Sequence, residues 1–332
     1  MNRYVSNTTL VDVANWVRGL KCVGVTTHAK PDGDAIGSTV GLVRALVRIG
    51  IDARLWYFPP VQPEFRQIVE PTPFGELVGD QPIDHEDIDG LIITDTGALP
   101  QLGGLSGWLS RHRERTCVLD HHIQGDDIAA LRVVNPEASA ASEVVADLIR
   151  VLEIPFDEQI ATPLYLGLAT DTGWFRFSNV RAKTFRYAAA FIDAGVNHAT
   201  LYRQIEQTHE ASRMLLLGRA LATMELLQNG RVALLKLRLS DYEAAGASQD
   251  ETHGFSDIPQ TIGKVEVVCL LAETEEGYTK MSLRSKHGPA AVDVNAVATT
   301  LGGGGHARAS GARLNMAFDE AETVMRKVLA EI

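Results

Sequence analysis

The chain has 332 residues, more than a single hydrophobic core usually organises, so we expect two domains. Its hydrophobic content of 45% allows ordinary cores, and no apolar run approaches the length needed to cross a bilayer. The net charge of −11 argues against a broad electrostatic grip on long nucleic acid, although a small anionic substrate is compatible with it. We therefore expect a protein that binds neither membranes nor long nucleic acid.

The first residues and the cysteines indicate a cytoplasmic protein. Residues 1–7 are mostly polar and lack the charged and then apolar pattern of a signal peptide. The three cysteines, Cys22, Cys117 and Cys269, are far apart and lie in apolar runs. We expect them to be small core residues, because neither a disulfide framework nor a zinc knuckle fits this number and spacing.

Between residue 22 and about residue 120, apolar strand-like runs alternate with helical patterns. This alternation predicts a mainly parallel sheet covered by helices. The prolines between residues 59 and 73 indicate irregular structure. The predicted strands cover residues 22–26, 53–57, 90–94 and 117–119, and helical patterns cover residues 35–50, 141–170 and 181–194.

The second half of the chain predicts a connector and a smaller α/β domain. A long helical pattern over residues 197–228 would suit an interdomain connector. Short strands then follow, and an amphipathic helix is predicted at about residues 319–329. The strands are predicted at residues 232–237, 265–272 and 278–283. We place the first domain at 1–195, a helical linker at 196–215 and the second domain at 216–332.

Metal-binding residue types recur where predicted apolar segments end. Because the carboxyl ends of parallel strands share one edge of a sheet, these side chains can converge on a divalent-metal site. Each alone has another reading: Asp32 or Asp34 could cap a helix, and Asp95 or Asp171 could be a turn residue. Recurrence at four segment ends favours the metal site. The residues are His28, Asp32, Asp34, Asp95, Asp120, His121, His122 and Asp171.

Two features of the second domain suit an anionic ligand. Residues 302–305 are four glycines, which let a backbone approach a ligand closely, although a flexible turn is the alternative. No Lys-Ser/Thr pair follows, so the run is not a P-loop. Strand alternation places Ser282, Arg284 and Lys286 on one face, which could bind substrate or be solvated.

The motifs in this order resemble those of the DHH/DHHA1 phosphoesterases, and within them the nanoRNase and pAp phosphatase branch. His28-x-x-x-Asp32-x-Asp34 resembles the first motif and Asp95 the second. Asp120-His121-His122 resembles the third, Asp171 the fourth, and Gly303-Gly304-Gly305-His306 the GGGH motif. The resemblance implies a parallel-sheet DHH domain, a helical linker and a smaller α/β DHHA1 domain, with the active site in the cleft between the domains.

The resemblance also implies two Mn²⁺ ions, for which Mg²⁺ or Co²⁺ could substitute. His28, Asp32 and Asp95 would hold one ion, and Asp34, Asp95, His121 and Asp171 the other. His122 would contact the scissile phosphate, and Asp120 would orient an imidazole; with Asp95 they form the expected catalytic set. The expected substrate contacts are Ser282, Arg284, Gly303, Gly304, Gly305, His306 and Arg308, with Lys286 undecided.

The activity implied is hydrolysis of short oligoribonucleotides or linear dinucleotides such as pApA and pGpG, and of 3′-phosphoadenosine-5′-phosphate (pAp) to AMP. A cyclic-dinucleotide phosphodiesterase stays open. An inorganic pyrophosphatase fits less well because it relies on a lysine-rich second domain, and no expected ligand is missing, as it would be in a non-catalytic nucleotide sensor. Two Asp-Thr-Gly sequences also occur in aspartic proteases, but that reading leaves the histidines and the glycine run unexplained. The oligomeric state is open, and a homodimer is one option.

Overall fold

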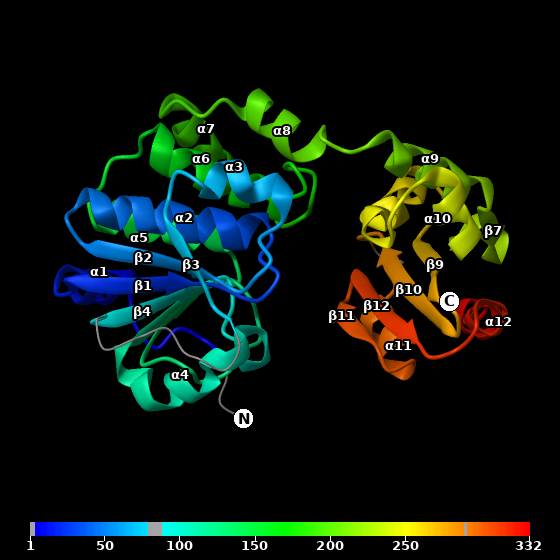
Figure 1. The fold of residues 1–332 in the computed structure, drawn as a ribbon, viewed down its shortest axis with the longest axis horizontal. Helices are drawn as coiled ribbons and strands as arrows, with labels where there is room; N and C mark the ends of the chain where they lie inside the picture. Colours follow the sequence, from blue (N-terminus) through cyan, green and yellow to red (C-terminus); the bar gives the residue numbers. More distant parts are fainter. Residues whose placement is uncertain (1–3, 79–87, 289–290) are drawn as a thin grey trace. The chain divides into compact units, whose positions relative to one another are not determined.

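The computed structural model describes residues 4–78, 88–288 and 291–332. The chain divides into two compact units, Met1–Thr208 (unit 1) and His209–Ile332 (unit 2), which Figure 1 colours along the sequence. Within the described residues each unit contains a six-stranded sheet and its own helices. The α/β class predicted from the sequence is confirmed, while the domain boundaries stay predictions.

The sheet of unit 1 is parallel throughout, with the order β3-β2-β1-β4-β5-β6. Its central strands are buried along their whole length, as their continuous apolar sequences require. The strand order reverses between β1 and β4, and ligands of open α/β sheets bind at the carboxyl ends beside such a reversal. The strands are β1 (Cys22–Thr26), β2 (Asp52–Tyr57), β3 (Phe74–Glu76), β4 (Gly90–Thr94), β5 (Thr116–Asp120) and β6 (Leu131–Val134).

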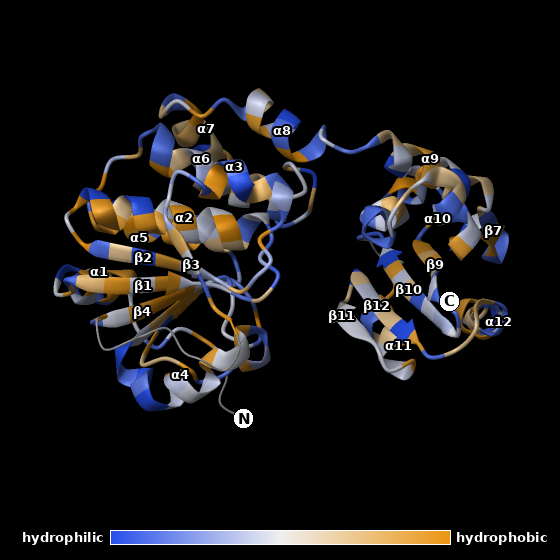
Figure 2. Ribbon diagram, viewed as in Figure 1, coloured by the Kyte–Doolittle hydropathy of each residue, from blue (hydrophilic) through white to orange (hydrophobic). Residues whose placement is uncertain are grey.

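Helices cover both faces of this sheet. One core lies between the sheet and α1, α2, α5 and α6, and a second lies on the face covered by α4 (Figure 1). Figure 2 shows apolar residues concentrated along β1 and β4 and along α2. The helices are α1 (Leu10–Arg18), α2 (Gly33–Arg48), α3 (Arg66–Val69), α4 (Ser106–His112), α5 (Ala141–Val151), α6 (Glu158–Asp171), α7 (Ala182–Asp193) and α8 (His198–Glu206).

Glycines let α2 and α6 lie in direct backbone contact. A Cβ atom at Gly37 would lie 2.3 Å from the carbonyl oxygen of Pro163 in α6. A Cβ atom at Gly33, one turn earlier, would lie 2.4 Å from Thr170 Oγ1. The two helices therefore run in opposite directions, and the beginning of α2 lies beside the end of α6.

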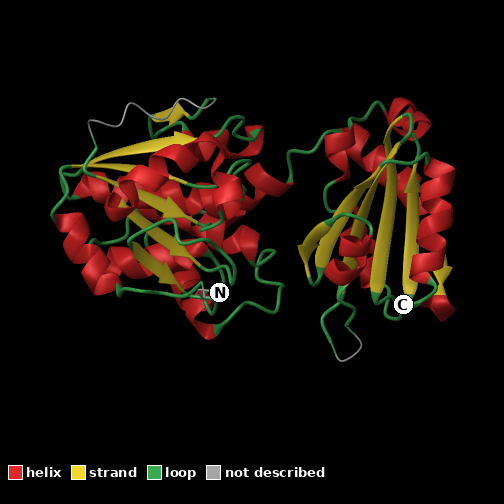
Figure 3. Ribbon diagram, turned by 90° about the horizontal axis from the view of Figure 1, so that it is seen from below, coloured by secondary structure: helices red, strands yellow, loops and turns green. Residues whose placement is uncertain are grey.

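Unit 2 is built on a mixed sheet with the order β11-β12-β10-β9-β8-β7, in which β8 and β9 are parallel and the other neighbours antiparallel. Figure 3 draws the strands in yellow and the helices in red. One face packs on α11 and α12 and the other on α9 and α10. The strands are β7 (Glu225–Leu227), β8 (Val232–Leu237), β9 (Val267–Glu275), β10 (Tyr278–Ser285), β11 (Gly304–His306) and β12 (Ala309–Leu314). The helices are α9 (Ala211–Ala222), α10 (Leu239–Ala245), α11 (Val294–Thr300) and α12 (Phe318–Leu329).

The helical patterns predicted over residues 141–170 and 197–228 were wrong in part, because each is interrupted and the second ends in strand β7 (Glu225–Leu227) rather than in a helix. Glu153 has a left-handed φ of 61° after α5, and Asp157 caps α6 by accepting a hydrogen bond from the Ile160 amide. The second pattern contains two separate helices. Helix α8 packs on the core of unit 1, and helix α9 packs on the core of unit 2. The break at residues 207–210 falls where neither core holds the chain.

Two smaller expectations concern the cysteines and membranes. All three cysteines are free and buried, which confirms that they are core residues. No helix in the described part of the chain is both long and apolar enough to span a membrane.

Candidate metal centre

Side chains from four segments of unit 1 meet at the carboxyl ends of β1, β4 and β5. His28 follows β1, Asp95 follows β4, and His121 and His122 follow β5. Asp171 is the last residue of α6, which the contact with α2 brings beside Asp34. Within the described residues, three sets of possible ligand atoms each lie within 4.8 Å of one another. These sets are Asp95, His121 and His122; His28, Asp32 and Asp95; and Asp34, His121 and Asp171.

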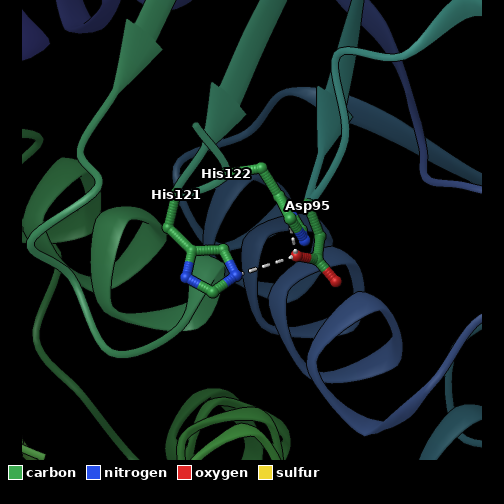
Figure 4. A group of neighbouring side chains, drawn as sticks. All are labelled: Asp95, His121 and His122. Atoms are coloured by element: carbon green, nitrogen blue, oxygen red, sulfur yellow. Dashed lines mark ion pairs between the residues drawn. The ribbon is translucent and has the colours of Figure 1, made fainter. Parts of the chain in front are cut away.

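Asp95 belongs to two of these three sets, and Figure 4 shows it facing His121 and His122. Its Oδ1 atom is 3.5 Å from His121 Nε2 and 3.7 Å from His122 Nδ1, and its Oδ2 atom is 3.5 Å from His28 Nε2. These distances exceed those of ordinary hydrogen bonds. Among the described residues no hydrogen-bond partner satisfies the buried Oδ1 atom. A buried carboxylate oxygen facing imidazole nitrogens without bonding to them fits a shared cation.

The charges of the cluster depend on one another. Burial acts to raise the pKa of Asp95, but His121 and His28 outweigh it and lower the pKa to about 2. Burial likewise acts to lower the histidine pKa values, but the surrounding carboxylates, Asp95 foremost, together outweigh it and raise the pKa of His28 to about 9 and that of His121 to about 10. In the metal-free protein, protons on the imidazoles thus balance the carboxylate, and a divalent cation would displace those protons.

Asp34 and Asp171 complete the side of the cluster near α5 and α6. Asp34 is almost fully buried and accepts hydrogen bonds from the amides of Ala141 (2.5 Å) and Ser142 (2.9 Å), at the N-terminus of α5. His121 Nε2 lies 4.0 Å from Asp34 Oδ2 and 3.6 Å from Asp171 Oδ2. Burial raises the pKa of both carboxyl groups, that of Asp171 to about 6, as expected for acids crowded together without a cation.

Asp32 both caps a helix and belongs to the cluster. Its Oδ1 atom accepts hydrogen bonds from the amides of Asp34 and Ala35, each 3.0 Å long, and so caps α2. The same side chain has a possible ligand atom in the set with His28 and Asp95. The two readings of Asp32 offered by the sequence are therefore compatible with each other.

Asp120 is fully satisfied by its neighbours. It is completely buried, and its Oδ1 atom accepts hydrogen bonds from the amides of His121 (2.7 Å) and His122 (3.1 Å). Oδ1 also lies 2.8 Å from His122 Nδ1, and Oδ2 accepts a 2.6 Å hydrogen bond from the Tyr4 hydroxyl. Asp120 thus orients His122, whose side chain is 39% exposed, whereas that of His121 is 15% exposed.

Sequence reasoning missed Tyr4. Its hydroxyl reaches Asp120 across 116 positions, and its ring fills the space that a Cβ atom at Gly97 or Gly125 would occupy. Burial raises the pKa of Tyr4 far above its ordinary value, so the hydroxyl keeps its proton and donates a hydrogen bond to the carboxylate. No local pattern around residue 4 signals this contact, although glycines at both 97 and 125 are compatible with a bulky neighbour.

The residues predicted in unit 2 are divided between a cavity and structural contacts. A cavity of about 980 Å³ lies over β10 and β12 and is lined by Ser282, Arg284, Gly304 and Gly311 among others. Arg284 Nε lies 3.3 Å from Asp257 Oδ1.

The other predicted contacts lie elsewhere. Lys286 Nζ donates to the carbonyl oxygen of Ile262 (2.7 Å), and Arg308 Nη1 donates to that of Val292 (2.6 Å); neither side chain lines the cavity. Cβ atoms at Gly303 and Gly305 would lie within 2.5 Å of backbone oxygens of β12. The glycine run therefore packs against β12, and His306 follows at the end of β11, with its side chain outside the described part of the structure.

Comparison with known proteins agrees with this arrangement. The DHH family N-terminal domain matches residues 22–168, and the DHHA1 domain matches residues 229–331. The bifunctional oligoribonuclease and PAP phosphatase NrnA of Thermus thermophilus is 33% identical, over 93% of this chain and 89% of its own length. A probable NrnA of Streptococcus mutans is 27% identical, over 89% and 90%. The crystal structure of an exopolyphosphatase-related protein from Bacteroides fragilis has a TM-score of 0.87 and 25% identity, and the match covers 97% of this chain and 96% of that one.

Proposed function

Because the chain belongs to the DHH/DHHA1 phosphoesterases, in the family of the NrnA oligoribonuclease and PAP phosphatases, we propose that it hydrolyses short oligoribonucleotides to mononucleotides. Linear dinucleotides such as pApA and pGpG are the proposed minimal substrates, and pAp would be converted to AMP. The observation that carries this proposal is the convergence of aspartates and histidines on Asp95, in a chain 33% identical to such an enzyme.

The donor set suits a pair of Mn²⁺ ions, because mixed imidazole and carboxylate ligands favour Mn²⁺ over Ca²⁺ or Mg²⁺. When bound, such ions polarise the phosphoryl group and lower the pKa of a coordinated water. The unsatisfied Oδ1 atom of Asp95 supports a bridging role for this carboxylate. The proposed ligands are His28, Asp32 and Asp95 for one ion, and Asp34, Asp95, His121 and Asp171 for the other.

The remaining residues would hold the substrate. Asp120 Oδ1 lies 2.8 Å from His122 Nδ1, and this contact would orient the imidazole for binding the scissile phosphate. In unit 2, Arg284 and Ser282 line the cavity over β10, where a guanidinium can bind a phosphate or stack on a base. Asp257 would hold the Arg284 guanidinium in position. The roles of His306 and Arg308 stay predictions.

The proposal is tested with Asp95→Asn, which keeps the side-chain volume and suits the left-handed backbone at this position (φ 62°). We expect Mn²⁺-dependent release of AMP from pApA to be lost and Mn²⁺ binding to weaken, because the shared anionic ligand is removed. The matched control is Asp193→Asn on the exposed face of α7, which should behave as the wild type. Both variants are assayed by chromatography of the products and by calorimetric Mn²⁺ titration.

The same assay distinguishes the alternative substrates. Wild-type protein is given pApA, pGpG, pAp, cyclic di-AMP and inorganic pyrophosphate side by side. Faster turnover of cyclic di-AMP or pyrophosphate than of the linear dinucleotides would contradict the proposed substrate class. Turnover of pApA by Asp95→Asn at the wild-type rate would contradict the proposed metal centre.

A further inference from the structure

A loop that closes on Asp171 carries an exposed aromatic ring. The Phe177 amide donates to the carbonyl oxygen of Thr172 over 3.0 Å. At the other end of the loop, Asn179 Nδ2 donates to the carbonyl oxygen of Asp171 itself over 3.1 Å. Residues 172–179 are therefore fixed at both ends to the residue that ends α6 and contributes a carboxylate to the candidate metal centre.

The backbone of this loop is strained. Gly173, Trp174 and Phe175 have φ values of 55°, 55° and 64°, so two residues with large side chains lie in the left-handed region. Such conformations persist only where the surrounding contacts impose them, and they cluster at ligand-binding sites. One such contact is the 2.8 Å hydrogen bond from Trp174 Nε1 to Glu206 Oε1 on α8.

The strained segment packs against the ring of Phe177. A Cβ atom at Gly173 would lie 2.4 Å from Phe177 Cζ, so the ring packs on a position that only glycine leaves open. Phe177 is nevertheless 51% exposed. A single exposed phenylalanine is common on protein surfaces, but this one lies on a loop that is hydrogen-bonded to the carbonyl oxygen of Asp171.

A cationic side chain accompanies the ring. Arg176 is exposed and donates through Nε to the carbonyl oxygen of Gly173 over 2.6 Å. Within the described ranges no ion pair involves Arg176, so its positive charge is not neutralised by a neighbouring carboxylate. Arg176 and Phe177 thus both contact Gly173, and an aromatic ring together with a cationic side chain is the combination of groups that binds single-stranded nucleotides.

We propose that Phe177 is a nucleobase platform, on which one base of the substrate stacks while its phosphate lies at the candidate metal centre. Since every base has a π face, this platform favours nucleotides over inorganic phosphates without selecting a base. The inference rests on the proposed function and adds a specificity residue to the same site.

The test compares steady-state kinetics of pApA hydrolysis with Mn²⁺ for the wild type, Phe177→Ala, Phe177→Trp and the control Phe74→Ala. Phe74 is also exposed (39%) but lies on β3. Losing one base stack should raise KM by about ten-fold or more while kcat changes little. Phe177→Trp should retain the wild-type KM, and so should the control. The rise in KM should disappear for one of two pApA analogues that each lack one base.

The outcomes separate this inference from the proposed function. If the wild type cleaves pApA and Phe177→Ala has the same KM, the platform is wrong and the proposed function stands. A rise in KM that persists with both analogues, or weaker Mn²⁺ binding by Phe177→Ala, would mean that the ring supports Asp171 structurally, and this too would overturn the platform. If the wild type does not cleave pApA, the proposed function fails and the platform with it.

Discussion

Asp95 and Asp120 are both buried carboxylates beside His122, yet their surroundings give them different roles. Asp120 accepts hydrogen bonds on both oxygens, whereas Asp95 Oδ1 has no hydrogen-bond partner within the described residues. A satisfied carboxylate orients its neighbours, while an unsatisfied one keeps its lone pairs for another ligand. Asp95 also belongs to two of the three sets of possible ligand atoms found among the described residues, whereas Asp120 belongs to none, and this placement separates the candidate metal ligand from the positioning aspartate.

Tyr4→Phe tests the positioning role at the scale of one atom. The variant keeps the ring that packs on Gly97 and removes only the hydroxyl that donates to Asp120 Oδ2. A buried acceptor that loses its donor should lower the free energy of unfolding by about 1–3 kcal/mol. We also expect kcat for pApA to fall because His122 is less firmly oriented. Denaturant unfolding and steady-state kinetics measure the two effects.

Tyr202→Phe is the control for that experiment. Tyr202 is 40% exposed on α8, so loss of its hydroxyl should change the unfolding free energy by less than about 0.5 kcal/mol. Equal stability and equal kcat in Tyr4→Phe and the wild type would mean that water replaces the hydroxyl and that Tyr4 has no positioning role.

At the scale of elements, the close contact of α2 with α6 brings Asp34 beside Asp171. Gly37→Ala should force the helices apart, because its Cβ atom would lie 2.3 Å from the Pro163 oxygen and 2.7 Å from the Gly167 nitrogen. We expect a loss of about 1–3 kcal/mol in unfolding free energy, as for other overpacked sites, together with weaker Mn²⁺ binding. Thermal or denaturant unfolding and Mn²⁺ titration measure both.

Gly218→Ala supplies the matched helical control. Gly218 lies inside α9, and a Cβ atom there meets nothing within 4 Å. Alanine at this position should therefore raise stability by about 0.5–1 kcal/mol through helix propensity alone. If Gly37→Ala were stabilised to the same extent, α2 and α6 could separate without cost, and the glycine contact would not position the cluster.

The elements that the sequence predicted best are those whose signals are local. The apolar strands that end at Thr26, Thr94 and Asp120 are recognisable from short runs, and so are the polar residues that follow them. Parallel pairing then brings these ends together without any knowledge of loop structure. This is why candidate ligands from distant segments could be grouped before a structure was available.

Contacts between distant segments escaped prediction. Two missed contacts are the hydrogen bond of Tyr4 and the packing of Phe177 on Gly173. Both depend on how loops fold in space, and the sequence around these residues carries no periodic pattern. The break at residues 207–210 was missed for a related reason: the apolar spacing continues from α8 into α9, although the two helices pack on different cores. Periodicity reports that a face is buried but not which core buries it.

At the scale of the whole molecule, the candidate metal ligands lie in one unit and the residues that line the cavity lie in the other. Every candidate ligand, from His28 to Asp171, lies in unit 1. The cavity that Arg284 and Ser282 line lies in unit 2. Each unit has its own hydrophobic cores, so we expect each unit to unfold in its own cooperative transition.

This division predicts that Mn²⁺ stabilises one unit and not the other. A ligand that binds only the folded form of unit 1 should stabilise it by about 2.7 kcal/mol at a concentration one hundred times its Kd. Hydrogen exchange of the whole chain, read separately on β1, β4 and β5 and on β8, β9 and β10, should then slow with Mn²⁺ in the first group only. Asp95→Asn should abolish the slowing, whereas Asp193→Asn should keep it. Equal slowing in both groups would contradict this prediction, because it would mean that the units unfold together or that unit 2 also binds the metal.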